Sequence, residues 1–214
     1  MKHPKVFIGA IGGSKSQYHI MLIDRNDFYY RGLKSAGGGY ANTKEQMQHV
    51  PKRQVNGTIL KALSETRFAD EGQLTETGAV YTFFWSGHKR EECREAGVGF
   101  AIKSNLLKNL ETLPKGINDR LMTMQQPLTD KKHATLISAF APIMTNPDEV
   151  KDKFYEELDS VISSVPTANK LLLFGDFNAR VGVDHQAWEG VIGKHSIGKC
   201  NSNGLLLLQS HSFN

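Results

Sequence analysis

Short apolar runs recur along this chain from residue 58 onward, each bounded by polar or glycine-containing segments. Runs of this length that are rich in β-branched and aromatic side chains are typical of buried strands. The pattern therefore predicts strands at residues 58–63, 80–85, 98–103, 133–140 and 171–174. The charged segment His88–Glu95 lies between two of these runs and is predicted to be a solvated connection.

Residues 146–165 have the periodicity of an amphipathic helix. Asn146 is a good N-cap, Pro147 suits the first turn, and two acidic residues follow where the helix dipole favours negative charge. Pro166 ends the segment. The order strand, helix, strand predicts an α/β fold with helices packed on a sheet. The apolar face of the helix consists of Val150, Phe154, Leu158, Val161, Ile162 and Val165.

The first 57 residues differ from the rest of the chain. They are rich in glycine, and they contain a strand pattern at Val6–Ile11 and a hairpin pattern in which His19–Ile23 is followed by Phe28–Tyr30. We therefore predict an atypical leader at residues 1–57, disordered in part, and a domain at residues 58–214.

Composition narrows the class of protein. The chain has 214 residues, 39% hydrophobic and 22% charged, which is ordinary for a globular protein with a core. No apolar run approaches the length of about 18 residues that a membrane span needs. The two cysteines are far apart and lack metal-ligand spacing. Their usage predicts reduced thiols in a nuclear or cytoplasmic protein.

The net charge of +4 at first suggests a nucleic-acid partner. Its distribution weakens this argument, because residues 1–58 hold nine Lys/Arg against three Asp/Glu and so carry +6. Residues 59–214 hold 17 Lys/Arg against 19 Asp/Glu and so carry −2. A prediction of nucleic-acid binding must therefore be based on sequence motifs and not on the net charge.

The most informative motif is Gly175-Asp176-Phe177-Asn178, directly after the apolar run at residues 171–174. The glycine marks the end of the predicted strand, which places a carboxylate and an amide at a strand end, where α/β proteins bind ligands. Such a pair suits phosphoryl chemistry, because the carboxylate can orient or deprotonate water and the amide can donate to a phosphate oxygen. A plain Asp/Asn turn after a strand is the alternative.

Three further motifs precede this one in order: Ser64-Glu65-Thr66, Gly97–Ala101 and Ala139–Pro142. The ordered set resembles the endonuclease/exonuclease/phosphatase superfamily, the DNase I-like metal-dependent phosphodiesterases. The closer resemblance is to the apurinic-type endonuclease domain of LINE-class retrotransposons and to the craniofacial development protein 2 group. It extends from Leu63 to Leu208 and includes Trp188–Gly193 and Gly198–Gly204. It implies an α/β fold, a four-layer sandwich with two facing sheets and helices outside, here truncated at both ends.

The resemblance also implies site residues. Glu65 matches the family's metal ligand, with Mg²⁺ as the expected cofactor and Mn²⁺ as an alternative. Asp176 matches the aspartate that orients or activates the attacking water, and Asn178 matches the asparagine that binds the scissile phosphate. Arg67 is placed to contact backbone phosphate, with a plain surface arginine as the alternative. The implied partner is DNA, and no membrane is implied.

The chain also departs from the family. Nothing in residues 1–57 matches the first strand, whose end supplies an asparagine near the metal. Phe140 stands where the family has a tyrosine whose hydroxyl contacts the phosphate region, and no Ser-Asp-His segment follows Leu208. We therefore expect an incomplete endonuclease domain with weak or no activity. The alternative is a catalytically dead pseudoenzyme that binds DNA or a protein partner; a phospholipid or inositol phosphate substrate is a third possibility.

Overall fold

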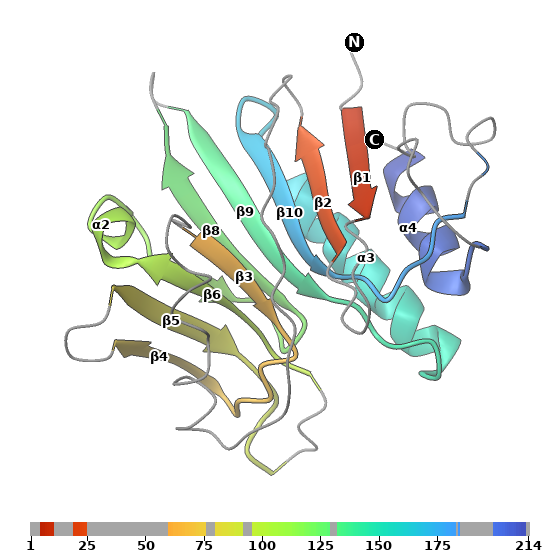
Figure 1. Ribbon diagram of the computed structural model, residues 1–214, viewed down its shortest axis with the longest axis horizontal. Coiled ribbons are helices and arrows are strands. Elements are labelled where there is room, and N and C mark those ends of the chain that lie inside the picture. Colours follow the sequence, from red (N-terminus) through yellow and green to blue (C-terminus); the bar gives the residue numbers. More distant parts are fainter. Residues whose placement is uncertain are drawn as a thin grey trace.

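The computed structural model describes residues 5–10, 19–24, 60–75, 80–91, 96–128, 132–182, 184 and 199–212. The larger of its two sheets has six strands, in the spatial order β1 (Lys5–Ala10), β2 (His19–Asp24), β10 (Lys170–Asp176), β9 (His133–Phe140), β8 (Leu121–Pro127) and β7 (Lys115–Gly116) (Figure 1). The smaller sheet has four, in the order β3 (Leu60–Ser64), β6 (Val98–Lys103), β5 (Tyr81–Ser86) and β4 (Glu71–Thr75). The described helices are α2 (Ser104–Leu107), α3 (Asp148–Ser164) and α4 (Ser202–Ser212).

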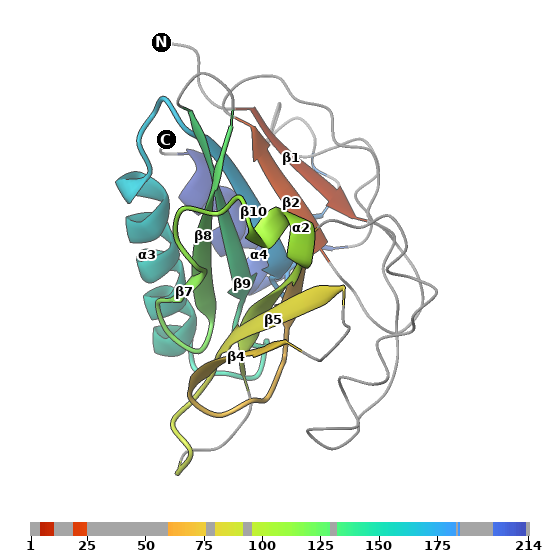
Figure 2. The same cartoon turned by 90° about the vertical axis from the view of Figure 1, so that its left-hand side faces the viewer.

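The two sheets face each other, and α3 and α4 lie on the opposite face of the larger sheet (Figures 1 and 2). This arrangement confirms the predicted α/β sandwich, of which the described residues form a helix layer and two sheet layers. One apolar cluster fills the space between the sheets and includes Phe84, Val98, Phe100, Ile102, Met122, Met124, Leu136 and Phe140. A second lies between the larger sheet and the helices and includes Leu121, Ile137, Phe154, Leu158, Leu171, Leu173, Phe177 and Leu207.

The parallel strands β9 and β10 lie at the centre of the larger sheet, and Asp176 pairs with Phe140 at their carboxyl ends. A strand covered on both faces needs an uninterrupted apolar run, because both sets of alternating side chains are buried. The run in β10 serves this purpose. Its side chains alternate between the helix-side core (Leu171, Leu173) and the inter-sheet core (Leu172, Phe174).

The predicted strand at residues 171–174 is therefore confirmed, but Gly175 does not end it. β10 continues to Asp176, and Gly175 pairs with Ala139 of β9. A Cβ atom at Gly175 would clash with the carbonyl oxygen of Ala139. Glycine is needed here because it lets two backbones approach closely, not because it terminates the strand.

The N-terminal strands extend the larger sheet. β1 corresponds to the predicted strand at residues 6–11, and it pairs antiparallel with β2. β2 also pairs antiparallel with β10. The predicted hairpin partner Phe28–Tyr30 lies outside the described residues. Two strands of the expected leader thus belong to the sheet, and the boundary at residue 57 stays a prediction.

The start of α3 differs from the prediction. Pro147, not Asn146, is the N-cap, and no side chain caps the first turn. The Oδ1 atom of Asn146 instead accepts a hydrogen bond from Ile143 N–H at 2.9 Å and closes the preceding turn. The end of the helix agrees with the prediction, because α3 stops at Ser164, just before Pro166.

The apolar face of α3 is confirmed at Phe154, Leu158, Ile162 and Val165, all of which are buried. Val150 is an exception, because its side chain is 39% exposed. The adjacent Lys151 is buried, with its Nζ atom 2.7 Å from Asp148 Oδ1 and 3.4 Å from Ser202 Oγ. A buried ammonium group needs such partners, and this one joins α3 to the start of α4.

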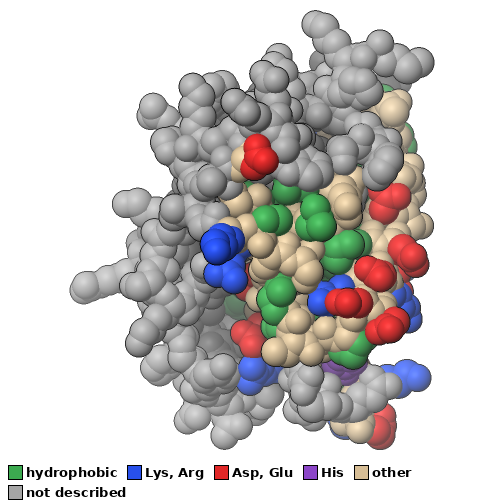
Figure 3. All heavy atoms as spheres, turned by 90° about the vertical axis from the view of Figure 1, so that its right-hand side faces the viewer, with side chains coloured by type: hydrophobic (Ala, Val, Ile, Leu, Met, Phe, Trp, Pro, Cys, Tyr) green, Lys and Arg blue, Asp and Glu red, His purple; other side chains and the backbone are tan. Residues whose placement is uncertain are grey.

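The helix side of the molecule carries negative charge. Figure 3 shows acidic side chains gathered there, beside a group of hydrophobic ones. The exposed carboxylates of α3 are Asp148, Glu149, Asp152 and Glu156. A polyanion would be repelled from this face.

Candidate active site

A tight turn follows β10 and carries two of the predicted site residues. Asp176 Oδ1 accepts a hydrogen bond from the backbone N–H of Asn178 at 2.9 Å, as in an Asx turn. Asn178 has a left-handed φ of 47°, which asparagine tolerates better than most residues. Phe177, between them, is fully buried in the helix-side core. The buried ring anchors the turn, while both polar side chains stay partly exposed.

The exit of β9 lies against this turn. Ala141 N–H donates to the carbonyl oxygen of Asp176 at 2.9 Å, and Asn178 Nδ2 donates to the carbonyl oxygen of Ala141 at 2.9 Å. An amide nitrogen carries two hydrogens, so the same group can bind this carbonyl and donate to a second acceptor. The two parallel strands therefore end in one hydrogen-bonded unit at the sheet edge.

Glu65 approaches this edge from the smaller sheet. Two hydroxyl groups join β3 to β9: Ser64 Oγ donates to Ala139 O at 3.5 Å, and Ser138 Oγ donates to Leu63 O at 3.3 Å. Ala139 is also the register partner of Gly175 in β10. The carboxyl end of β3 therefore lies against the carboxyl ends of β9 and β10, and Glu65 leaves β3 at the edge that carries Asp176.

Glu65 and Arg67 form an ion pair, with Arg67 Nη2 at 2.7 Å from Glu65 Oε1. The side chains are 48% and 39% exposed, respectively. Both residues have left-handed backbones, with φ of 57° and 56°. Such conformations cost about 1–3 kcal/mol each and are concentrated at functional sites. The segment is held by hydrogen bonds from Thr66 N–H and Arg67 N–H to the carbonyl oxygens of Gly97 and Ala96.

Glu65 is the carboxylate of this edge best suited to a divalent cation. Mg²⁺ is usually bound by one or two carboxylates together with substrate phosphates, and it keeps several waters. An exposed carboxylate beside a turn with a second carboxylate fits that requirement. Within the described ranges, no three His, Cys, Asp or Glu side chains gather closely enough to form a protein cage around a metal. A metal bound at this edge would therefore have few protein ligands and keep most of its waters, as Mg²⁺ commonly does.

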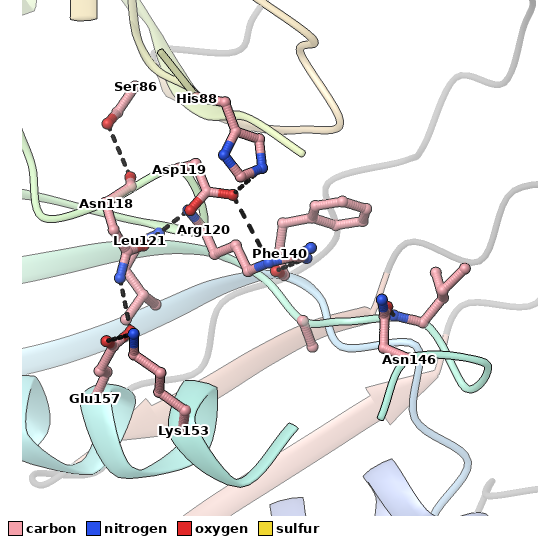
Figure 4. A network of polar contacts seen from close by, with 12 residues as sticks. Ser86, His88, Asn118, Asp119, Arg120, Leu121, Phe140, Asn146, Lys153 and Glu157 are labelled. Atoms are coloured by element: carbon pink, nitrogen blue, oxygen red, sulfur yellow. Dashed lines mark hydrogen bonds and ion pairs between the residues drawn. The ribbon is translucent and has the colours of Figure 1, made fainter. Parts of the chain in front are cut away.

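A charged network supports the end of β9 (Figure 4). Asp119 Oδ2 lies 2.9 Å from His88 Nε2 and 3.7 Å from Arg120 Nε. Arg120 Nη1 donates to the carbonyl oxygen of Phe140 at 3.3 Å, and its guanidinium lies over the Phe140 ring, 5.6 Å from the centroid. The network therefore fixes the residue that pairs with Asp176.

Sequence reasoning missed this network. The described part of the predicted connection, residues 88–91, lies outside helices and strands, and residues 89–91 are exposed. The His88 side chain, however, is 28% exposed and is paired with Asp119. The two residues are distant in sequence, and Asp119 also accepts a hydrogen bond at its carbonyl oxygen from Gly97 N–H at 2.9 Å. A lone histidine in a charged loop gives no signal of such a partner.

The four predicted site residues thus form two directly bonded pairs on adjoining strand ends. Arg67 contacts the Glu65 carboxylate, whereas the sequence predicts a contact with phosphate. The catalytic, phosphate-binding and metal-binding roles stay predictions. The segment Trp188–Gly193, which contributes to the resemblance, lies outside the described residues.

The chain is similar in sequence to craniofacial development protein 2. It is 30% identical to the protein of Tragulus javanicus over 160 residues, which cover 72% of this chain and 25% of that protein. It is 28% identical to the protein of Bos taurus over 169 residues, which cover 78% of this chain and 26% of that protein. The chain therefore spans about a quarter of the length of the curated relatives it matches. No protein-family model matches it.

Two solved structures were found to be similar to this chain. The catalytic domain of Xenopus laevis APE2 has a TM-score of 0.51 and 15% identity, and the match covers 78% of this chain and 61% of that one. The AP endonuclease LMAP from Leishmania major has a TM-score of 0.48 and 14% identity, and the match covers 79% and 61% of the two chains. At such identity, the likeness to APE2 shows a shared fold.

Proposed function

We propose that this chain, which has the DNase I-like α/β fold of the endonuclease/exonuclease/phosphatase superfamily and resembles craniofacial development protein 2, is a Mg²⁺-dependent DNA endonuclease domain of retrotransposon origin. The observation that carries the proposal is the meeting of two polar pairs, Glu65–Arg67 and Asp176–Asn178, at adjoining ends of β3, β9 and β10. Left-handed backbones at Glu65, Arg67 and Asn178 add support, because such strain is concentrated at functional sites.

Each residue has a role that its chemistry permits. Asp176 would orient a water molecule and take its proton at the carboxylate. Asn178 Nδ2 would donate to a phosphate oxygen, and Arg67 would add positive charge beside it. Glu65 would hold Mg²⁺, which when bound neutralises phosphate charge and supports the leaving oxygen.

DNA is the proposed substrate, and the nucleus or cytoplasm the proposed location. The acidic helix side is unsuited to a polyanion, so DNA would approach at the strand ends that carry the site. Membrane lipid is a less suitable partner, and no helix in the described ranges is long and apolar enough to cross a membrane.

A catalytically dead domain that binds DNA or a protein is the second candidate. The observation that favours it is Phe140, whose ring is 5% exposed and lies under Arg120. The family resemblance places a tyrosine hydroxyl at this position, and phenylalanine keeps the packing but lacks that polar group. On this basis we expect weak activity from the chain.

The proposal predicts that the purified chain nicks supercoiled plasmid and cuts a duplex with one abasic site only when Mg²⁺ or Mn²⁺ is present. Gel analysis of the products, with and without chelator, measures this. Metal-dependent cleavage would support the nuclease assignment. Cleavage unaffected by chelator would contradict the metal requirement, and no cleavage from a sample shown to be folded by circular dichroism would favour the binding alternative.

Replacing Glu65 with glutamine is expected to raise the Mg²⁺ concentration for half-maximal nicking by about tenfold or more, because a neutral amide binds a hard cation less well than a carboxylate. The glutamine oxygen can still accept the hydrogen bond from Arg67, so the local fold should persist. Glu149→Gln, at an exposed position of α3, is the matched control. An identical Mg²⁺ dependence for both variants would show that Glu65 is not a ligand of the metal.

A further inference from the structure

The segment just before α4 reaches the Asp176–Asn178 turn through a single side chain. Asn201 Oδ1 accepts hydrogen bonds from Arg180 N–H at 2.9 Å and from Gly204 N–H at 2.8 Å. Its Nδ2 atom donates to the carbonyl oxygen of Asn178 at 3.0 Å. The bond to Gly204 follows the N-cap pattern. The two ends of this side chain therefore have separate partners, because one caps the helix and the other holds the turn.

Asn203, two residues later, is fully buried and binds the same region. Its Nδ2 atom donates to the carbonyl oxygen of Pro142 at 2.7 Å and to that of Phe177 at 3.2 Å. The first carbonyl belongs to the exit of β9, and the second to the turn after β10. One buried amide thus joins both strand exits, and removing a hydrogen-bond partner from a buried carbonyl is costly.

The start of α4 is itself fixed in place, which makes it a rigid support. The Tyr155 hydroxyl of α3 donates to the backbone carbonyl oxygen of Asn203 at 3.0 Å. Burial raises the pKa of Tyr155 well above its ordinary value, so the hydroxyl keeps its proton and remains a donor. Gly204 packs so closely that a Cβ atom would clash with the carbonyl oxygen of Arg180. The helix start is therefore held on two sides.

We propose that Asn201 and Asn203 are positioning residues for the candidate active site, in that they set the orientation of the Asp176 carboxylate and the Asn178 amide through the backbone of the turn. This inference rests on the proposed function. Neither side chain need touch DNA, because both act on backbone carbonyls. The family resemblance includes residues 198–204 but assigns them no role. Positioning of the turn would be the role of this motif.

Asn201→Asp separates positioning from helix capping. Aspartate keeps both acceptor bonds and is as good an N-cap as asparagine, but it replaces the donor that faces Asn178 O with an acceptor. Asn201→Ala removes both functions without adding charge. Asn105→Asp, at an exposed position of α2, is the matched control for the added charge.

Backbone amide exchange measured by NMR is the first readout. For Asn201→Asp we expect exchange at Asn178 to be about tenfold faster or more, with Leu207 and Leu208 of α4 unchanged. For Asn201→Ala both regions should exchange faster, and the control should match the wild type. Unchanged exchange at Asn178 in Asn201→Asp would overturn the proposal, as would equal changes in the turn and the helix.

Nicking kinetics are the second readout. The Asn201→Asp variant should lose about tenfold in kcat because the Asp176 carboxylate is misplaced, with a smaller change in KM because the Asn178 amide is one phosphate contact among several. A loss confined to KM would contradict positioning. If the wild-type chain does not nick DNA, the proposed function fails, while the exchange pattern still decides whether these residues order the turn.

Discussion

Replacing Asp176 with asparagine is expected to lower the rate of metal-dependent nicking by about a thousandfold, the scale of a lost general base in a site that acts as a set. Asparagine has the same shape, and its Oδ1 atom can still accept the hydrogen bond from Asn178 N–H, so the turn should persist. An amide oxygen cannot take a proton from water near neutral pH. The rate on an abasic-site duplex at saturating Mg²⁺ measures the effect.

Asp152→Asn is the control for this substitution, because Asp152 is an exposed carboxylate of α3 on the far side of the larger sheet. It should nick at the wild-type rate, and both variants should melt within a few degrees of the wild type. Equal nicking by Asp176→Asn and the wild type would assign the activity to a contaminating nuclease or to another residue. In both cases Asp176 would have no part in the proposed chemistry.

The sequence predicts β6, β9 and β10 correctly, but it misses β7 and β8, although Leu121, Met122 and Met124 of β8 are buried. β6, β9 and β10 carry apolar runs because both sides of each strand are covered, and this leaves a signal in the sequence. β4 was missed, since four of its five residues are exposed and its sequence Glu-Gly-Gln-Leu-Thr has little apolar pattern. It is a strand because it pairs with β5, which is a tertiary contact.

The contacts of the candidate site also differ in how well the sequence predicts them. The pairs Asp176–Asn178 and Glu65–Arg67 are each two residues apart, so their contacts are local and motif recognition finds them. The bond from Asn201 to Asn178 crosses a long stretch of sequence and follows from where α4 packs. Asn201 has this role because its amide lies at this position in the fold, and a single sequence cannot reveal that position.

Local rules can also fail where two local contacts compete. Asn146 has the right type and position for an N-cap, and the rule is sound in general. Its side chain is used instead by the turn at Ile143, and Pro147 takes the cap position with an extended backbone (φ −54°, ψ 151°). Sequence alone could not show which of the two turns the amide would close.

Replacing Gly175 with alanine is expected to destabilise the protein by about 3 kcal/mol or more, at the upper end of the cost of forcing a methyl group into a packed interior. The new Cβ would overlap the carbonyl oxygen of Ala139 and lie 2.7 Å from its carbonyl carbon and 3.0 Å from its nitrogen. These are backbone atoms of the paired central strand, so no side-chain rotation can relieve the overlap. Urea denaturation followed by tryptophan fluorescence would give the loss in unfolding free energy.

Gly182→Ala provides the graded comparison. Gly182 has a left-handed φ of 77°, but the nearest atom to an added Cβ is 3.2 Å away, the backbone nitrogen of Cys200. The conformational penalty there is about 1–2 kcal/mol, and the close approach to Cys200 adds a steric cost smaller than that of the direct overlap at Gly175. Gly175→Ala should therefore reduce the unfolding free energy clearly more than Gly182→Ala, and equal losses would mean that β9 and β10 can separate easily.

Because Asp176 follows Gly175 and pairs with Phe140, a separation of β9 and β10 would also misplace the Asp176 carboxylate. Stability and nicking should therefore fall together in Gly175→Ala, whereas in Asp176→Asn only nicking should fall.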